Sequence, residues 1–73
     1  MNRAEHLAWC KQRALAYLDT DDDYVNAFNS MASDLQKHAE TAGHAGVEIG
    51  LGLLMIGQLS TAHAMREFIN GFN

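Results

Sequence analysis

Residues 42–58, AGHAGVEIGLGLLMIGQ, place the strongest limit on the fold of this chain. This stretch is apolar on nearly every side of a helix, and a helix that is apolar all round must be buried all round. Each glycine within it costs the helix roughly 0.5–1 kcal/mol relative to alanine. Because Gly46, Gly50 and Gly57 fall at positions i, i+4 and i+11, on one side, we expect them to let another backbone come very close. The stretch predicts a buried, glycine-rich central helix.

A chain of 73 residues has few elements with which to surround such a helix. At this size the hydrophobic core supplies only about 3–5 kcal/mol, and small domains commonly add a staple or form oligomers. We therefore expect a homo-oligomer or a complex with another protein. The predicted interface consists of Gly46, Gly50, Leu53, Gly57 and Trp9. Tryptophan is included because it is enriched in interface hot spots, with partial burial of Trp9 as the alternative.

Composition limits the class of protein. An apolar content of 48% indicates one globular domain over residues 1–73. The net charge is −4 and the 5 Lys and Arg residues are scattered, so nucleic-acid binding is not expected. The single Cys10 fits a reducing compartment, and the longest apolar run, residues 49–56, is far short of the ~20 residues that span a membrane. The polar first residues do not resemble a secretory signal, so we expect a cytoplasmic protein.

Capping signals divide the first half of the chain into two helices. Asn2 followed by Glu5 has the spacing of a capping box and predicts a helix that runs to about residue 18 or 19. Three aspartates at residues 21–23 end this helix and start the next one. The second helix has the clearest periodicity in the chain. Its apolar stripe consists of Tyr24, Ala27, Phe28, Met31, Leu35 and His38.

The second half of the chain carries signals of the same kind. Thr41 is predicted to cap a third helix, which Gly57 stops. Either Ser60 or Thr61 caps a fourth helix, which ends at Gly71. The apolar positions of that helix are Met65, Phe68, Ile69 and Phe72. The expected fold class is all-α, a small bundle of four short helices that form two αα-hairpins in an up-down arrangement.

Histidines and the cysteine are the residues that a reaction or a metal would use. His6 and Cys10 are four residues apart on one helix and can share a metal ion, but zinc needs three or four ligands. His38 and His44 flank a connection and fit either a ligand pair or a pH-sensitive hinge. The structural interpretation is favoured: a solvent-facing or edge His6, a buried Cys10 and histidines at helix ends. We predict no catalytic residue, no metal and no cofactor, and we do not expect an enzyme.

Three strings carry a resemblance to a known group of proteins. They are RAEHLAWCKQRALAYLD at residues 3–19, AFNSMASDLQKHAETAGHAG at residues 27–46 and MREFINGFN at residues 65–73. Together they resemble a family of small proteins of unknown function that tailed bacteriophages and prophages encode. The family pattern has proline where this chain has Ala39 and Ala62, both at helix boundaries. The resemblance implies expression inside a bacterial host and supplies no mechanism.

These observations favour a small intracellular protein-interaction module. We expect it to self-associate through the glycine-rich helix and to act by stoichiometric binding to a host or phage protein, for example as an inhibitor of a host defence. One alternative is a nucleic-acid-binding helix-turn-helix built from the last two helices. The exposed side of the last helix, however, offers only Arg66 and Asn70, with Glu67 opposing them. A virion-associated structural protein is a further alternative.

Overall fold

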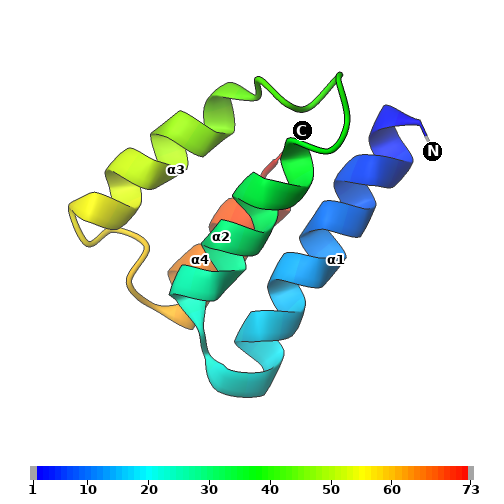
Figure 1. Cartoon of the computed structure of the whole chain (residues 1–73). Helices are drawn as coiled ribbons and strands as arrows, with labels where there is room; N and C mark the ends of the chain where they lie inside the picture. Colours follow the sequence, from blue (N-terminus) through cyan, green and yellow to red (C-terminus); the bar gives the residue numbers. More distant parts are fainter. Residues whose placement is uncertain (1, 73) are drawn as a thin grey trace.

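The computed structural model describes residues 2–72, and four helices form within this part of the chain. They are α1 (Arg3–Asp21), α2 (Tyr24–Leu35), α3 (Ala45–Met55) and α4 (Ala62–Asn70). Consecutive helices run in alternating directions (Figure 1). The predicted all-α bundle of four short helices is confirmed. Residues 1 and 73 of the predicted domain lie outside the described residues.

Local sequence sets most of the helix ends. The side chains of Asn2, Asp23 and Thr61 each accept a hydrogen bond from the amide three residues further on, as the N-caps of α1, α2 and α4. Gly57 follows the end of α3 with a φ of +82°, a left-handed conformation that costs glycine little. Its amide and the next one donate to carbonyls of the preceding turn, which is the Schellman pattern. The predicted caps at Asn2 and Thr61 and the stop at Gly57 are confirmed.

Thr41 and His38 do not lie where the sequence predicts. α3 is capped by His44, whose Nδ1 accepts a hydrogen bond of 2.9 Å from the Gly46 amide. Thr41 is fully buried before α3, and its hydroxyl donates to the Leu35 carbonyl over 2.7 Å. The hydroxyl thereby satisfies a carbonyl at the end of α2, which has no partner within the helix. Because α2 ends at Leu35, His38 lies in the following turn and does not extend the apolar stripe.

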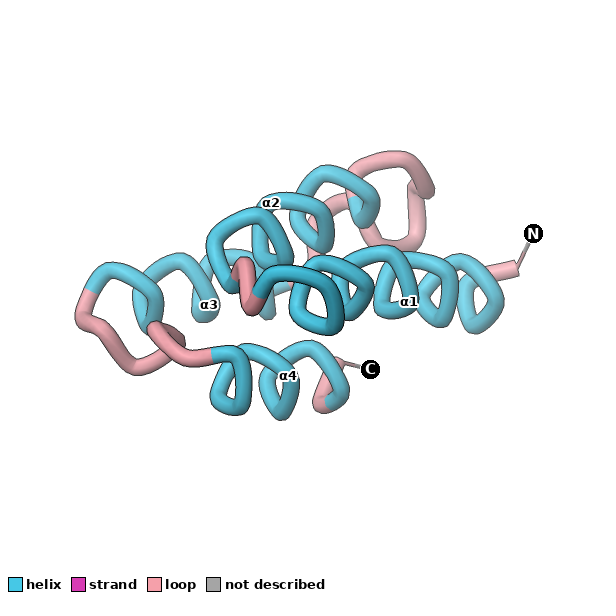
Figure 2. Tube along the Cα trace, turned by 90° about the horizontal axis from the view of Figure 1, so that it is seen from below, coloured by secondary structure: helices cyan, strands magenta, loops and turns pink. Residues whose placement is uncertain are grey.

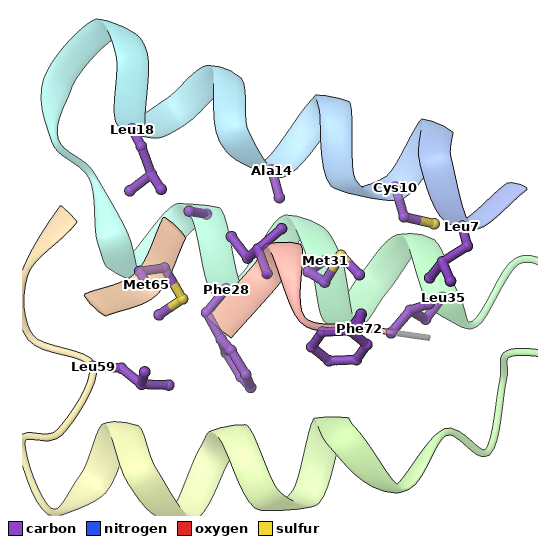
Figure 3. Close-up of a cluster of buried hydrophobic side chains, with 12 residues drawn as sticks. Leu7, Cys10, Ala14, Leu18, Phe28, Met31, Leu35, Leu59, Met65 and Phe72 are labelled. Carbon is purple, nitrogen blue, oxygen red and sulfur yellow. The ribbon is translucent and has the colours of Figure 1, made fainter. Parts of the chain in front are cut away.

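The core lies between α1, α2 and α4. α1 and α2 pack side by side, and α4 lies against both (Figure 2). The buried hydrophobic residues, shown in Figure 3, include most of the predicted stripe positions of α2 and α4 and further residues of α1. They are Leu7, Cys10, Ala14, Leu18, Ala27, Phe28, Met31, Leu35, Leu59, Met65, Ile69 and Phe72. None of these residues belongs to α3, so α3 is a peripheral helix and the second predicted hairpin, between α3 and α4, is open.

Glycines let α3 lie against aromatic rings of the core. A Cβ atom added to Gly50 would lie 2.5 Å from Phe68 Cζ and 2.6 Å from Phe28 Cε1. A Cβ atom added to Gly46 would lie 2.7 Å from Phe72 Cε1. The rings of Phe28 and Phe72 point toward α3 in Figure 3. The expected close approach at Gly46 and Gly50 therefore occurs, but the group that approaches is a ring of the same chain and not another backbone.

The opposite side of α3 is open to solvent. Gly50 is the only buried residue of this helix, whereas Ile49 is 60% exposed and Met55 is 79% exposed. The prediction of a helix buried all round is therefore wrong for the single chain. The physical reason is that α1, α2 and α4 supply the buried core, and α3 packs on that core with one side only. α3 covers one side of that core. Within residues 2–72, no other helix covers the outer side of α3.

Alanine substitutions at two glycines of α3 test this packing. Alanine favours a helix over glycine by roughly 0.5–1 kcal/mol. A Cβ at Gly52 meets nothing within 4 Å, so Gly52→Ala should raise the free energy of unfolding by about that amount. Gly50→Ala should lower it by about 1–3 kcal/mol, because the rings of Phe28 and Phe68 must move. Urea unfolding followed by circular dichroism measures both, and a stabilising Gly50→Ala would contradict the packing.

Candidate interaction surface

The side of α3 that faces away from the core is apolar and exposed. Six residues, including the C-cap of the helix, recur there at spacings of three and four. These residues, here called the α3 outer face, are Ala45, Glu48, Ile49, Gly52, Met55 and Ile56. Ile49, Ile56 and Met55 are 60%, 70% and 79% exposed. Single exposed apolar residues are ordinary, but several large ones in one row with a single charge are typical of an interaction site.

Gly52 lies at the centre of the α3 outer face. It has open space around the position of a Cβ atom, unlike Gly46 and Gly50. Ile49 and Met55 lie three residues before and after it, so the glycine forms a shallow notch between large side chains. Gly52 was not among the residues predicted for the interface. Its distance of two residues from Gly50 indicates that the two glycines lie on opposite sides of the helix.

The five residues predicted as an interface do not form one surface. Gly46 and Gly50 face rings of their own chain, and Leu53 packs against the core from a half-buried position. Gly57 lies in the turn after α3, and Trp9 is half-buried on α1. In the single chain these residues therefore share no exposed surface, because the side of α3 that carries Gly46 and Gly50 is turned inward.

A polar cluster covers Trp9 and joins α1 to the end of α2. The side chain of Asp34 is only 2% exposed and accepts hydrogen bonds from Arg13 Nε over 2.6 Å and Lys37 Nζ over 2.9 Å. The same two cations lie over the Trp9 ring, with Arg13 Cζ at 4.7 Å and Lys37 Nζ at 5.5 Å from its centroid. Trp9 is therefore a packed part of this cluster and not an anchor presented to a partner.

The pKa of the Asp34 carboxyl reflects two opposing effects. Burial by itself raises this pKa, because it disfavours the charged form. The hydrogen bonds from Lys37 and Arg13 outweigh burial and hold the pKa below its ordinary value. The carboxylate is therefore charged at neutral pH and fully paired. Such a cluster ties two helices together and leaves little capacity to bind a further cation.

His6 and Cys10 meet, but not as a catalytic pair. The predicted solvent-facing or edge position of His6 is wrong: the residue is 4% exposed, and its ring packs against those of Trp9 and His38. His6 Nε2 lies 2.9 Å from the Asp34 carbonyl oxygen, which can only accept, so this nitrogen carries a hydrogen and donates it. The same nitrogen is 3.4 Å from Cys10 Sγ and cannot take the thiol proton in this state.

Cys10 is also held in its neutral form. Burial, and then the nearby charge of Asp34, raise the pKa of its thiol. A neutral thiol is a weak nucleophile and a weak metal ligand, because the thiolate is the reactive form. Within residues 2–72, no three His, Cys, Asp or Glu side chains come close enough together to hold a metal ion. The cysteine and the histidine therefore act as packing residues.

The exposed side of α4 carries an arginine and a histidine that each contact a carboxylate. Arg66 Nη2 donates to Asp19 Oδ1 of α1 over 2.8 Å. His63 Nε2 lies 3.3 Å from Glu67 Oε1, one turn further along the helix. Each basic group of α4 thus has an acidic neighbour, and the helix does not present a basic surface to a phosphate backbone. The helix-turn-helix alternative gains no support from this geometry.

Comparison with models of known families, with curated proteins and with solved structures found no match. The resemblance to phage and prophage proteins therefore stays a prediction. Among residues 2–72, the helices lack the combination of length and apolar character that a membrane span requires. The functional interpretation accordingly rests on the α3 outer face.

Replacing Asp34 by asparagine tests the polar cluster. The folded-state pKa of Asp34 is lowered, so its contribution to stability is present above a pH of about 4, where the unfolded carboxyl ionises. That contribution is lost as the pH falls through the folded-state pKa. Asp34→Asn should lower the free energy of unfolding at pH 7 by about 1–3 kcal/mol and should reduce its decline in acid. Urea titrations between pH 7 and pH 2 measure both effects.

The matched control for this variant is Asp19→Asn. Asp19 is also paired with an arginine, but its side chain is 64% exposed. Removing such an exposed pair should change the free energy of unfolding by less than about 1 kcal/mol. If the free energy of unfolding falls equally with decreasing pH in the wild type and in Asp34→Asn, the ionisation of Asp34 is not linked to folding.

Proposed function

We propose that this chain is a small protein-interaction module that acts by stoichiometric binding of another polypeptide and not by catalysis. The observation that carries this proposal is the α3 outer face, where Ile49, Met55 and Ile56 are each more than half exposed. Complete burial of one such side chain is worth about 1.5–3 kcal/mol. Covering the face with a partner is therefore the largest source of binding free energy that the described surface offers.

The charge pattern supports a polypeptide partner. α3 contains no lysine or arginine, its one charged residue is Glu48, and the whole chain has a net charge of −4. Nucleic acids and anionic membrane surfaces are recognised by clusters of lysine and arginine. An apolar helix face with an acidic edge instead fits an apolar groove or a helix of another protein.

We further propose where the protein acts and which kind of protein it binds. The resemblance to proteins of tailed phages and prophages supports the cytoplasm of a bacterial host as the place of action. There the chain would self-associate and would also bind a host or phage protein, for example to inhibit a host defence. The same face would serve a virion-associated role, which the presence of the chain in purified particles would reveal.

Photocrosslinking in cells tests the α3 outer face as the binding surface. A photoreactive benzoylphenylalanine replaces Met55 in the full chain, and in the matched control it replaces Gln12, an exposed residue of α1. Illumination should produce an adduct of defined mass from position 55 and not from position 12, because only position 55 lies on the proposed surface. Adding Ile49→Lys to the first variant should remove the adduct.

Mass spectrometry identifies the captured polypeptide, whether it is a second copy of the chain or another protein. Adducts of equal yield from both positions, or from neither, would contradict a binding surface on α3. An adduct that persists with Ile49→Lys would place the contact outside the apolar face.

A further inference from the structure

The α3 outer face is complementary to itself. A two-fold symmetric interface needs a patch in which each residue of one copy meets a counterpart on the other. A small residue at the axis lets two helices approach closely. Gly52 supplies the small group, and large side chains flank it on both sides at Ile49 and Met55. When two such helices cross at their notches, the backbones come close and the large side chains of each copy lie alongside those of the other.

We propose that the occupant of the α3 outer face is a second copy of this chain, with the two α3 helices antiparallel and crossing at Gly52. This inference rests on the proposed function, since it names one partner of the same surface. The glycine that serves self-association is thus Gly52. Gly46 and Gly50 serve the packing of α3 within the chain.

The single charge of the face selects the antiparallel arrangement. In a parallel pair, the two Glu48 carboxylates would lie beside each other within the seam and repel. In an antiparallel pair each Glu48 lies four residues from the crossing, on opposite sides of it. A rise of about 1.5 Å per residue then separates the two carboxylates by roughly 12 Å, which exceeds the Debye length of about 8 Å at physiological ionic strength.

The size of the face fits a weak, reversible dimer. Exposed fractions of 60–79% at Ile49, Ile56 and Met55, together with the exposed Ala45, Glu48 and Gly52, correspond to a patch on the order of 500 Å² per copy. Two copies therefore bury on the order of 1,000 Å², which is the lower limit for a specific interface. Because the core of α1, α2 and α4 is formed without the second copy, the monomer stays folded when the dimer dissociates.

Sedimentation equilibrium of the purified full chain tests whether two copies associate. The mass should rise from 8.1 kDa toward twice that value as the concentration increases from low micromolar to millimolar. Ile49→Lys should weaken dimerisation at least about tenfold, because it puts a charge into the apolar seam, far from the Glu48 carboxylate of the second copy. Val25→Lys is the matched control, since Val25 is an apolar residue of α2 that is 46% exposed and lies outside the face. Circular dichroism checks that both variants keep their helices.

Oxidative cross-linking tests the orientation. Cys10 is fully buried, so introduced thiols are the reactive ones. A mixture of Glu48→Cys and Ile56→Cys chains should form a disulfide-linked pair, and neither variant should do so alone. Cross-linking of each variant with itself would show parallel helices and would overturn the proposed arrangement.

The outcomes separate this inference from the proposed function. A mass of 8.1 kDa at all concentrations would overturn the second copy, while a photocrosslinked adduct with a different polypeptide would still support the interaction module. Equal weakening of the dimer by Ile49→Lys and Val25→Lys would place the interface elsewhere and overturn the inference. A dimer that only Ile49→Lys disrupts supports it.

Discussion

Two glycines of α3 lie against the aromatic rings of the core, and this contact determines which side of α3 is buried. Gly50 leaves room for the ring edges of Phe28 and Phe68, and Gly46 leaves room for Phe72. These contacts fix the rotation of α3 about its own axis. With the Gly46–Gly50 side turned inward, the residues half a turn away must point outward. The packing that completes the core therefore also creates the α3 outer face.

The remaining polar interactions stabilise the frame to which α3 is attached. Asp34 is paired with Arg13 and Lys37, and the His6 ring donates to the Asp34 carbonyl near the end of α2. The Thr41 hydroxyl satisfies a further carbonyl at the same helix end. Buried polar groups with such partners hold helices in one arrangement and do not seek new ligands. The large side chains of the α3 outer face, by contrast, have solvent on their outer side, which is why we assign binding to them.

The helices and most of their caps could be predicted from the sequence, because those signals act within one turn. The spacing of Asn2 and Glu5 and the glycine at position 57 needed no knowledge of the rest of the fold. The rotation of α3 could not be predicted, since a helix that is apolar all round and has glycines on both sides offers no preferred face. The burial of Thr41 and His6 was equally hidden, because it depends on carbonyls that another segment brings close.

Nuclear Overhauser spectroscopy of the isotope-labelled chain reports which glycine touches the rings. We expect contacts from the α protons of Gly50 to the ring protons of Phe28 and Phe68, and none from Gly52 within the same chain. The α protons of Gly50 should also have shifted resonances, since two rings lie against them. Contacts from Gly52 to these rings, with none from Gly50, would show α3 turned by half a revolution. The large apolar side chains would then face the core, and the proposed binding surface would not exist.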